Sequence, residues 1–241
     1  YRAPSVKELY LDFVIDAHVI KGNTNLKAED GHNASASLSY ILPVKKHAVT
    51  FSGSGFYNYI FNKIDLVNVG LNSNGTPVYQ YFNFKNYSTY GGGAGVNYKW
   101  ERLNVSAMFQ YTGYQVIYQS SSSSKVNMWS PDFTASASYL IPKAEISVNL
   151  MYKYNGVKPL YGVDNQFHAG TRNAYHLLDA SLSRSFWKDR IQVTIGGKNL
   201  LGVKNVLVNG EVVTGHTTNP NQMNIAWGRT FFTSLVLHFG K

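Results

Sequence analysis

The residues best suited to bind a ligand are a few histidines and aromatic side chains in turn-rich stretches. His18 lies between two segments with turn signals, residues 1–10 and 22–29, which together predict a long surface loop. Two further histidines, His168 and His216, lie in segments expected to be long loops, where they can face a ligand. Trp129 follows a serine-rich stretch, and its indole ring can stack on a flat ligand such as a porphyrin, a corrin or a sugar. Loop residues of these types are also common without any ligand.

The same residues argue against catalysis and against a protein-bound metal. The 7 histidines have no metal-ligand spacing, and the 13 acidic residues include no paired carboxylates or Ser/His/Asp grouping. Because the chain has no cysteine, disulfides and thiolate metal sites are excluded. We therefore expect a protein that is not an enzyme, with no catalytic residues and no intrinsic cofactor.

The elements that must position these residues follow from the composition. Of 241 residues, 44% are hydrophobic and 15% aromatic, but only 15% are charged, against about a quarter in ordinary soluble domains. No window approaches the roughly 18 uninterrupted apolar residues of a membrane helix. The net charge of +9 does not indicate a nucleic-acid partner, because the cations are scattered and Lys45-Lys46 is the only adjacent pair.

Alternation of apolar with small polar side chains runs through most of the chain and predicts long strands. Ala34, Ala36, Leu38 and Tyr40, for example, alternate with serine. Nine strands are predicted, at residues 33–40, 49–61, 89–100, 103–112, 133–141, 146–154, 178–186, 191–198 and 231–239. Short turns alternate with long loops near residues 62–88, 119–131, 155–174 and 202–223, as in a bacterial outer-membrane barrel.

This pattern favours an all-β transmembrane antiparallel β-barrel over a soluble β-sandwich. A sandwich exposes Lys, Glu and Asp on its outer face, whereas the polar face here is Ser, Thr, Asn, Gln and Gly. Aromatic residues gather near both strand ends, with Tyr98 and Trp100 by a short turn and Tyr57 and Tyr59 toward a long loop. Two such belts match the two interfaces of a membrane.

Nine strands do not close such a barrel, because bacterial single-chain barrels have an even strand number and an open edge is costly in lipid. The sequence begins without a leader or an initiating methionine. We therefore expect the chain to be the C-terminal part of a larger barrel, or to pair with a companion chain that supplies the missing strands.

Two motifs connect this expectation to a family. The segments Tyr1-Arg2-Ala3-Pro4 and Gly22-Asn23-Thr24-Asn25-Leu26, with Glu29, resemble a box of TonB-dependent outer-membrane receptors that reads aromatic-Arg-Ala-Pro, then Asn-Pro-Asn-Leu and a Glu. The tract Gly196-Gly197-Lys198-Asn199-Leu200 resembles the Gly-x-Asn-Leu motif of that family's penultimate strand, and the aromatic last strand is similar to its terminal assembly signal. The resemblance covers the whole chain, with Tyr1 for the usual Phe and Thr24 for Pro.

The resemblance implies the C-terminal nine strands of a 22-stranded barrel. Residues 1–32 would form an extracellular loop and residues 33–241 the strands, with the plug domain and the other 13 strands outside this chain. The expected location is the outer membrane of a Gram-negative bacterium, with the long loops extracellular and the C-terminus periplasmic. Expected partners are outer-membrane lipid and lipopolysaccharide, the TonB complex acting through the plug, and a surface lipoprotein.

The family's function is active uptake, so the resemblance implies a receptor for a scarce nutrient. In haem receptors of this family the two halves of the box flank a loop histidine that can ligate haem iron, and His18 occupies that place. Tyr1 and Arg2 are candidate ligand-binding residues beside it. Haem or another iron chelate is the leading expected cargo, with cobalamin or a glycan as the alternative. A loop histidine without a ligand, an outer-membrane enzyme and a passive porin are the remaining hypotheses.

Overall fold

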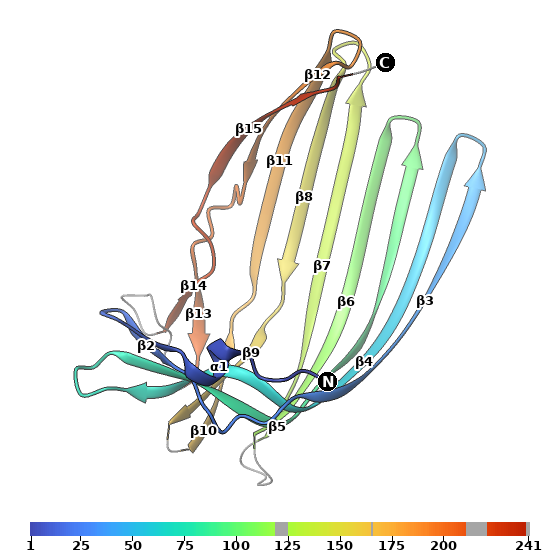
Figure 1. The fold of residues 1–241 in the computed structure, drawn as a ribbon. Coiled ribbons are helices and arrows are strands. Elements are labelled where there is room, and N and C mark those ends of the chain that lie inside the picture. Colours follow the sequence, from blue (N-terminus) through green and yellow to red (C-terminus); the bar gives the residue numbers. More distant parts are fainter. Residues whose placement is uncertain (119–124, 165, 211–220, 240–241) are drawn as a thin grey trace.

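The computed structural model describes residues 1–118, 125–164, 166–210 and 221–239. Its main feature is a tall, curved antiparallel wall whose strands mostly follow one another along the chain (Figure 1). The wall consists of β3 (Asp30–Val44), β4 (His47–Leu71), β5 (Pro77–Trp100), β6 (Leu103–Ile117), β7 (Lys125–Ile141), β8 (Ile146–Asn155), β11 (Tyr175–Phe186), β12 (Ile191–Lys198) and β15 (Thr230–Leu237). The predicted all-β fold is confirmed. Among the described residues, no helix is long and apolar enough to cross a membrane.

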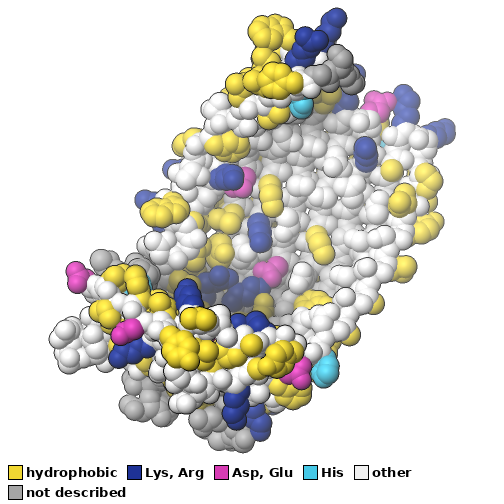
Figure 2. Space-filling view, viewed as in Figure 1, with side chains coloured by type: hydrophobic (Ala, Val, Ile, Leu, Met, Phe, Trp, Pro, Cys, Tyr) yellow, Lys and Arg dark blue, Asp and Glu magenta, His cyan; other side chains and the backbone are white. Residues whose placement is uncertain are grey.

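The two faces of the wall differ as the alternation predicts. Residues paired directly across a ladder share a face. Ser54 pairs with Gly93 on the polar, concave face, and Tyr57 pairs with Tyr90 on the apolar, convex face. Figure 2 looks onto the concave face, whose wall is largely white, the colour of side chains that are neither apolar nor charged. Large apolar side chains on the other face, such as Leu38, are exposed.

The segments predicted as long loops contain strands of their own. β4 has 25 residues and β5 has 24, so their hairpin continues through residues 62–88 and turns only between Leu71 and Pro77. At about 3.3 Å per residue, β4 is about 80 Å long. A strand that crosses a membrane needs only about ten residues, so much of β4 extends beyond the membrane-crossing length. The loop prediction was wrong here because Val, Tyr and Phe favour strands even where strict alternation is lost.

The ends of β4 and β5 far from the short turns, from Lys63 to Phe84, extend the sheet beyond the wall. We call this extension the loop sheet. The hairpin of β1 (Asp12–Ile15) and β2 (His18–Lys21) joins it, because β2 runs parallel to β5. On the other side, the hairpin of β9 (Lys158–Asp164) and β10 (Gln166–Arg172) meets β4, and β13 (Asn205–Asn209) with β14 (Gln222–Asn224) extends the sheet. In Figure 1 the loop sheet bends away from the wall at the end opposite the short turns.

The hydrophobic core cluster lies where the loop sheet meets the wall. Val67, Phe84 and Val116 are almost completely buried there, and the rings of Tyr161 and Phe167 from the β9–β10 hairpin pack against them. Burial of such side chains contributes about 1.5–3 kcal/mol each. The loop sheet is therefore fixed by packing as well as by hydrogen bonds, and it gives this end of the wall a defined shape.

The wall strands approach each other closely at Gly91, which gives a test of the fold. A Cβ on Gly91 would lie 2.1 Å from the Tyr111 carbonyl oxygen and 3.1 Å from Thr112 Cα, whereas a Cβ on Gly53 would meet nothing within 4 Å. We expect Gly91→Ala to destabilise the folded wall by about 1–3 kcal/mol, because backbone atoms must move. The matched control Gly53→Ala should leave stability unchanged. The measurement is the temperature at which the full outer-membrane protein loses its compact mobility on gels, and equal temperatures for both variants would contradict the packing.

Candidate functional site

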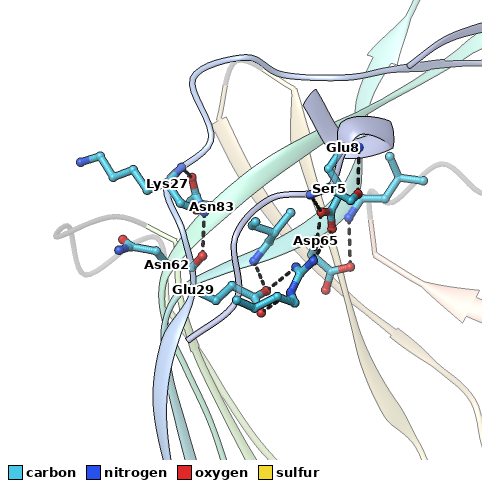
Figure 3. Close-up of polar contacts among 10 residues, drawn as sticks. Ser5, Glu8, Lys27, Glu29, Asn62, Asp65 and Asn83 are labelled. Atoms are coloured by element: carbon cyan, nitrogen blue, oxygen red, sulfur yellow. Dashed lines mark hydrogen bonds and ion pairs between the residues drawn. The ribbon is translucent and has the colours of Figure 1, made fainter. Parts of the chain in front are cut away.

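The opening segment, which the sequence predicts to be a loop, folds compactly at the junction of the wall and the loop sheet. We call its residues 1–10 and 22–29 the clamp. It contains the short helix α1 (Val6–Tyr10), which starts with a capping box. The Glu8 amide donates to Ser5 Oγ at 3.3 Å, and the Ser5 amide donates to Glu8 Oε2 at 2.7 Å. These two bonds satisfy helix N-terminal donors that otherwise have no partner. Figure 3 shows this end of the clamp beside the ribbon of the sheet.

Arg2 is the centre of the clamp. Its Nε and Nη2 donate to the two oxygens of Glu29 at 2.8 and 2.9 Å, and its Nη1 donates to both oxygens of Glu8 at 2.9 Å. The backbones of Arg2 and Glu29 also exchange two hydrogen bonds of 2.9 Å. A planar guanidinium that bridges two carboxylates joins the two halves of the sequence box into one unit.

Glu29 connects the clamp to the wall. Its Oε1 accepts a 2.6 Å hydrogen bond from the Ile64 amide, beyond the point where β3 stops pairing with β4 at Phe61. The next neighbour of β4 on that side is β9, at Asn68. The Glu29 carboxylate therefore satisfies a backbone donor in the gap where β4 changes partners.

The second half of the box does the same for β5. β6 accompanies β5 only as far as Asn86, and β2 joins it at Gln80. Between these points the Asn23 side chain donates to the Tyr81 carbonyl at 2.9 Å. Asn83 Oδ1 accepts from the Lys27 amide at 2.7 Å, which attaches the box to a side chain of β5 (Figure 3). The box thus gives both long strands hydrogen-bond partners where neighbouring strands are missing.

The charges of the clamp perturb its carboxyl groups. The hydrogen bond from Arg2 lowers the pKa of Glu29, against the opposing effect of partial burial, and the Ile64 amide lowers it further. Burial raises the pKa of Glu8, but the hydrogen bonds from Ser5 and Arg2 outweigh burial, so the net shift is also downward. Both glutamates are therefore ionised at neutral pH and hold Arg2 as a charged group.

His18 lies in a different environment from the predicted one. It is the first residue of β2, only 7% exposed, with its ring 5.9 Å from that of Phe13 and 6.2 Å from that of Tyr79. The prediction of an exposed loop position was wrong, because residues 12–21 form a hairpin that adds to β5. Haem can reach the imidazole only if this hairpin moves, and haem ligation by His18 stays a prediction.

Trp129 also lies in a strand and not in a loop. It lies in β7 and pairs with Gly113 of β6. Its ring stacks on Tyr111 at 4.9 Å and meets Tyr90 edge-on at 5.0 Å. Because Gly113 pairs in turn with Tyr90 on the convex face, Trp129 belongs to the aromatic belt. The loop position that suggested a stacking role is therefore not observed.

The remaining candidate residues do not converge on one site. His168 is half-buried in β10, opposite Gly162 of β9. Tyr1 is 91% exposed at the outer side of the clamp, and the hydrogen bonds of the Arg2 guanidinium go to Glu8 and Glu29. His216 lies outside the described residues. Their ligand-binding roles stay predictions. Within the described ranges, no three His, Asp or Glu side chains cluster so as to hold a metal ion.

The comparison with protein families decides which fold family this architecture represents. The model of the TonB dependent receptor-like β-barrel matches residues 1–200. The chain belongs to this family. Barrels of TonB-dependent receptors lie in the outer membrane of Gram-negative bacteria, which supports the predicted location. The family comprises transporters and not enzymes, as expected from the lack of a catalytic grouping in the sequence.

Solved structures of TonB-dependent receptors have the same fold at low sequence identity. The FrpB iron transporter of Neisseria meningitidis is 15% identical, with a TM-score of 0.54 over 91% of this chain and 33% of that chain. A mutant ferric enterobactin receptor, PfeA of Pseudomonas aeruginosa, is 18% identical, with a TM-score of 0.56 over 90% of this chain and 32% of that chain. The chain therefore spans about a third of the length of these receptors. A comparison with curated proteins gave no match.

The second motif, Gly196-Gly197-Lys198-Asn199-Leu200, also holds parts of this TonB-dependent receptor barrel together. Asn199 directly follows β12 with a positive φ of 51°, and its side chain donates to the Val203 carbonyl at 2.6 Å and to the Gly228 carbonyl at 3.1 Å. Its amide donates to Asp179 Oδ1 at 2.7 Å. Asn199 therefore joins the two ends of the segment between β12 and β15, just as the clamp joins the base of the opening segment.

The role of Glu29 as a substitute strand partner can be tested in the full receptor. Glu29→Ala removes both the ion pair and the acceptor for Ile64, so exchange at the Ile64 amide should be about fivefold faster or more. Glu29→Gln retains an acceptor oxygen and should have a smaller effect. The control Glu101→Gln removes an exposed ion pair with Lys46 and should change nothing. Hydrogen exchange followed by mass spectrometry gives the measurement.

The same experiment has a pH dependence with a definite sign. Because the pKa of Glu29 is lowered in the folded protein, its stabilising effect is complete above the ordinary value of 4.5 and is lost as the pH falls through the lowered value. The difference between the wild type and Glu29→Gln should therefore shrink below pH 4.5. A difference that grows on acidification would contradict the ion pair as its cause.

Proposed function

We propose that this chain forms the C-terminal part of a TonB-dependent transporter that takes up an iron chelate across the outer membrane. The observation that carries the proposal is the family match over residues 1–200, which includes the clamp and most of the wall. In this proposal the short turns face the periplasm and the loop sheet faces the exterior. The TonB complex acts through a plug domain, and the plug and the remaining strands of a 22-stranded barrel come from outside this chain.

The choice of an iron chelate rests on two kinds of support. The structural neighbours are named as an iron transporter and as a ferric enterobactin receptor. The concave face also suits an anionic cargo, because Lys and Arg side chains gather in the hollow next to the loop sheet (Figure 2). Binding of cobalamin or a glycan would not require such a cationic lining, so the structure supports these cargoes less well.

Uptake by the full receptor tests the proposal directly. In iron-starved cells whose other ferric-chelate receptors are deleted, we expect accumulation of labelled iron from a supplied ferric chelate. Deletion of TonB should reduce this accumulation to the level of cells without the receptor, because active uptake requires the inner-membrane energy source. Uptake that continues unchanged without TonB would instead indicate a passive pore.

Haem is the narrower form of the proposal, and it rests on His18. The β1–β2 hairpin places this imidazole beside Phe13 and Tyr79, whose rings can flank a porphyrin if the hairpin opens. We expect His18→Ala to weaken haem binding and to shift the haem absorption spectrum, because an axial nitrogen ligand is lost. His47→Ala, at the short-turn end of β4, is the control histidine variant. An unchanged spectrum and affinity in His18→Ala would remove haem as the cargo and leave iron-chelate uptake intact.

A further inference from the structure

A row of polar side chains crosses the concave face where the β9–β10 hairpin leaves the wall. Gln110 of β6 pairs with Asp132 of β7, Asp132 pairs with Asn155 of β8, and Asn155 pairs with Tyr175 of β11. Residues paired in this way share a face and lie at the same height. Gln110 is in register with Gly93 and Ser54, so the row lies on the polar side of the wall.

The base of the β9–β10 hairpin places two cations over this row. Lys158 and Arg172 are direct partners across the ladder between β9 and β10. The Lys158 ammonium forms an ion pair with Asp132, and the Arg172 guanidinium lies 5.0 Å from the centroid of the Tyr175 ring. Like charges directly opposite each other destabilise a sheet. One carboxylate compensates only one of the two cations.

Two hydrogen-bond donors in this cluster find no acceptor within the described part of the chain. Asn155 is 8% exposed, and both its Nδ2 and the Nε of Arg172 are buried without a hydrogen-bond partner among the described residues. A buried donor without an acceptor costs stability. Both groups need an oxygen acceptor, and the excess positive charge favours an oxygen that carries negative charge. Lys153, two residues before Asn155 in β8, adds another cation on the same face.

We propose that Arg172, Lys158 and Asn155 form an anion-binding site on the concave face at the base of the β9–β10 hairpin. The site takes a ligand through negatively charged oxygens, as found in carboxylate, catecholate and phosphate groups. Tyr175 supports the Arg172 guanidinium from one side, and Asp132 holds the Lys158 ammonium in place. The proposal rests on the proposed function only in its identification of the anion as part of a transported iron chelate.

Binding to the purified full receptor tests the site. The probes are a ferric tris-catecholate, which is anionic, and a ferric tris-hydroxamate, which is uncharged. We expect Arg172→Gln to weaken binding of the catecholate about tenfold or more, because a charge-assisted hydrogen bond is lost, and to leave hydroxamate binding nearly unchanged. Arg102→Gln, in the short turn between β5 and β6, is the matched control and should bind both probes as the wild type does.

Asn155→Leu separates a binding role from a merely structural one. If the amide binds the anion, this variant loses catecholate affinity. If the amide is only a buried donor, its removal raises the unfolding temperature and leaves affinity unchanged, which would exclude Asn155 from the site. Equal catecholate affinity in the wild type and in folded Arg172→Gln would overturn the whole proposal.

The outcome for the site can be distinguished from the outcome for iron uptake. If the wild-type receptor binds neither ferric chelate, the proposed function fails, and titration with inorganic phosphate then decides the site by itself. Phosphate binding that is lost in Arg172→Gln supports an anion site with a different natural ligand. Phosphate binding that is absent, or equal in both proteins, overturns it.

Discussion

The structure depends on the change of partners along β4 and β5. Both strands start in the wall and continue into the loop sheet, so each must leave one neighbour and gain another partway along its length. Backbone donors and acceptors in such a gap need partners wherever water is excluded. The Glu29 carboxylate and the Asn23 amide supply them, and the hydrogen bonds of Arg2 hold the Glu29 carboxylate in position. The sequence box thus connects the wall with the loop sheet.

This arrangement explains why the buried core is found at the loop end. The wall exposes apolar side chains on its convex face, as a membrane barrel does, and carries small polar side chains on its concave face. Neither face forms a dry core by itself. Within the described residues, the dry core cluster forms where the loop sheet meets the wall, around Val67, Phe84 and Val116. The loop end is therefore the most firmly packed part of the described chain and a suitable support for ligand recognition.

Charge on the concave face is distributed unevenly. Nearer to the short turns, Lys198 and Asp179 line the same pocket, so a positive and a negative side chain occur together there. At the base of the β9–β10 hairpin, Lys158 and Arg172 face each other, and the Asp132 carboxylate forms an ion pair with Lys158. The positive excess thus coincides with the place where the wall opens toward the loop sheet. In the proposed uptake, an anion that enters from the loop end meets this positive excess before it reaches the region around Lys198 and Asp179.

The sequence alone determined the strands of the wall and the nature of their two faces. Alternation is a local property of the chain, so the predicted strand at residues 191–198 agrees with β12 and the one starting at residue 103 agrees with β6. The family resemblance also followed from short motifs. Sequence reasoning missed the strands at residues 62–88 and the strand position of Trp129. Within β4, the positive φ of 51° at Asn62 and the register shift between Asn68 and Leu71 interrupt the regular alternation.

Only the tertiary structure decided what the candidate residues contact. Arg2 and Glu29 meet because the ends of one loop converge, and Lys158 faces Arg172 because a hairpin folds back with a particular register. The burial of His18 depends on a parallel pairing with β5, some sixty residues later in the chain. Contacts of this kind are set by long-range register and strand order, which local alternation does not contain. The sequence therefore determined the wall, and the three-dimensional fold decided the site.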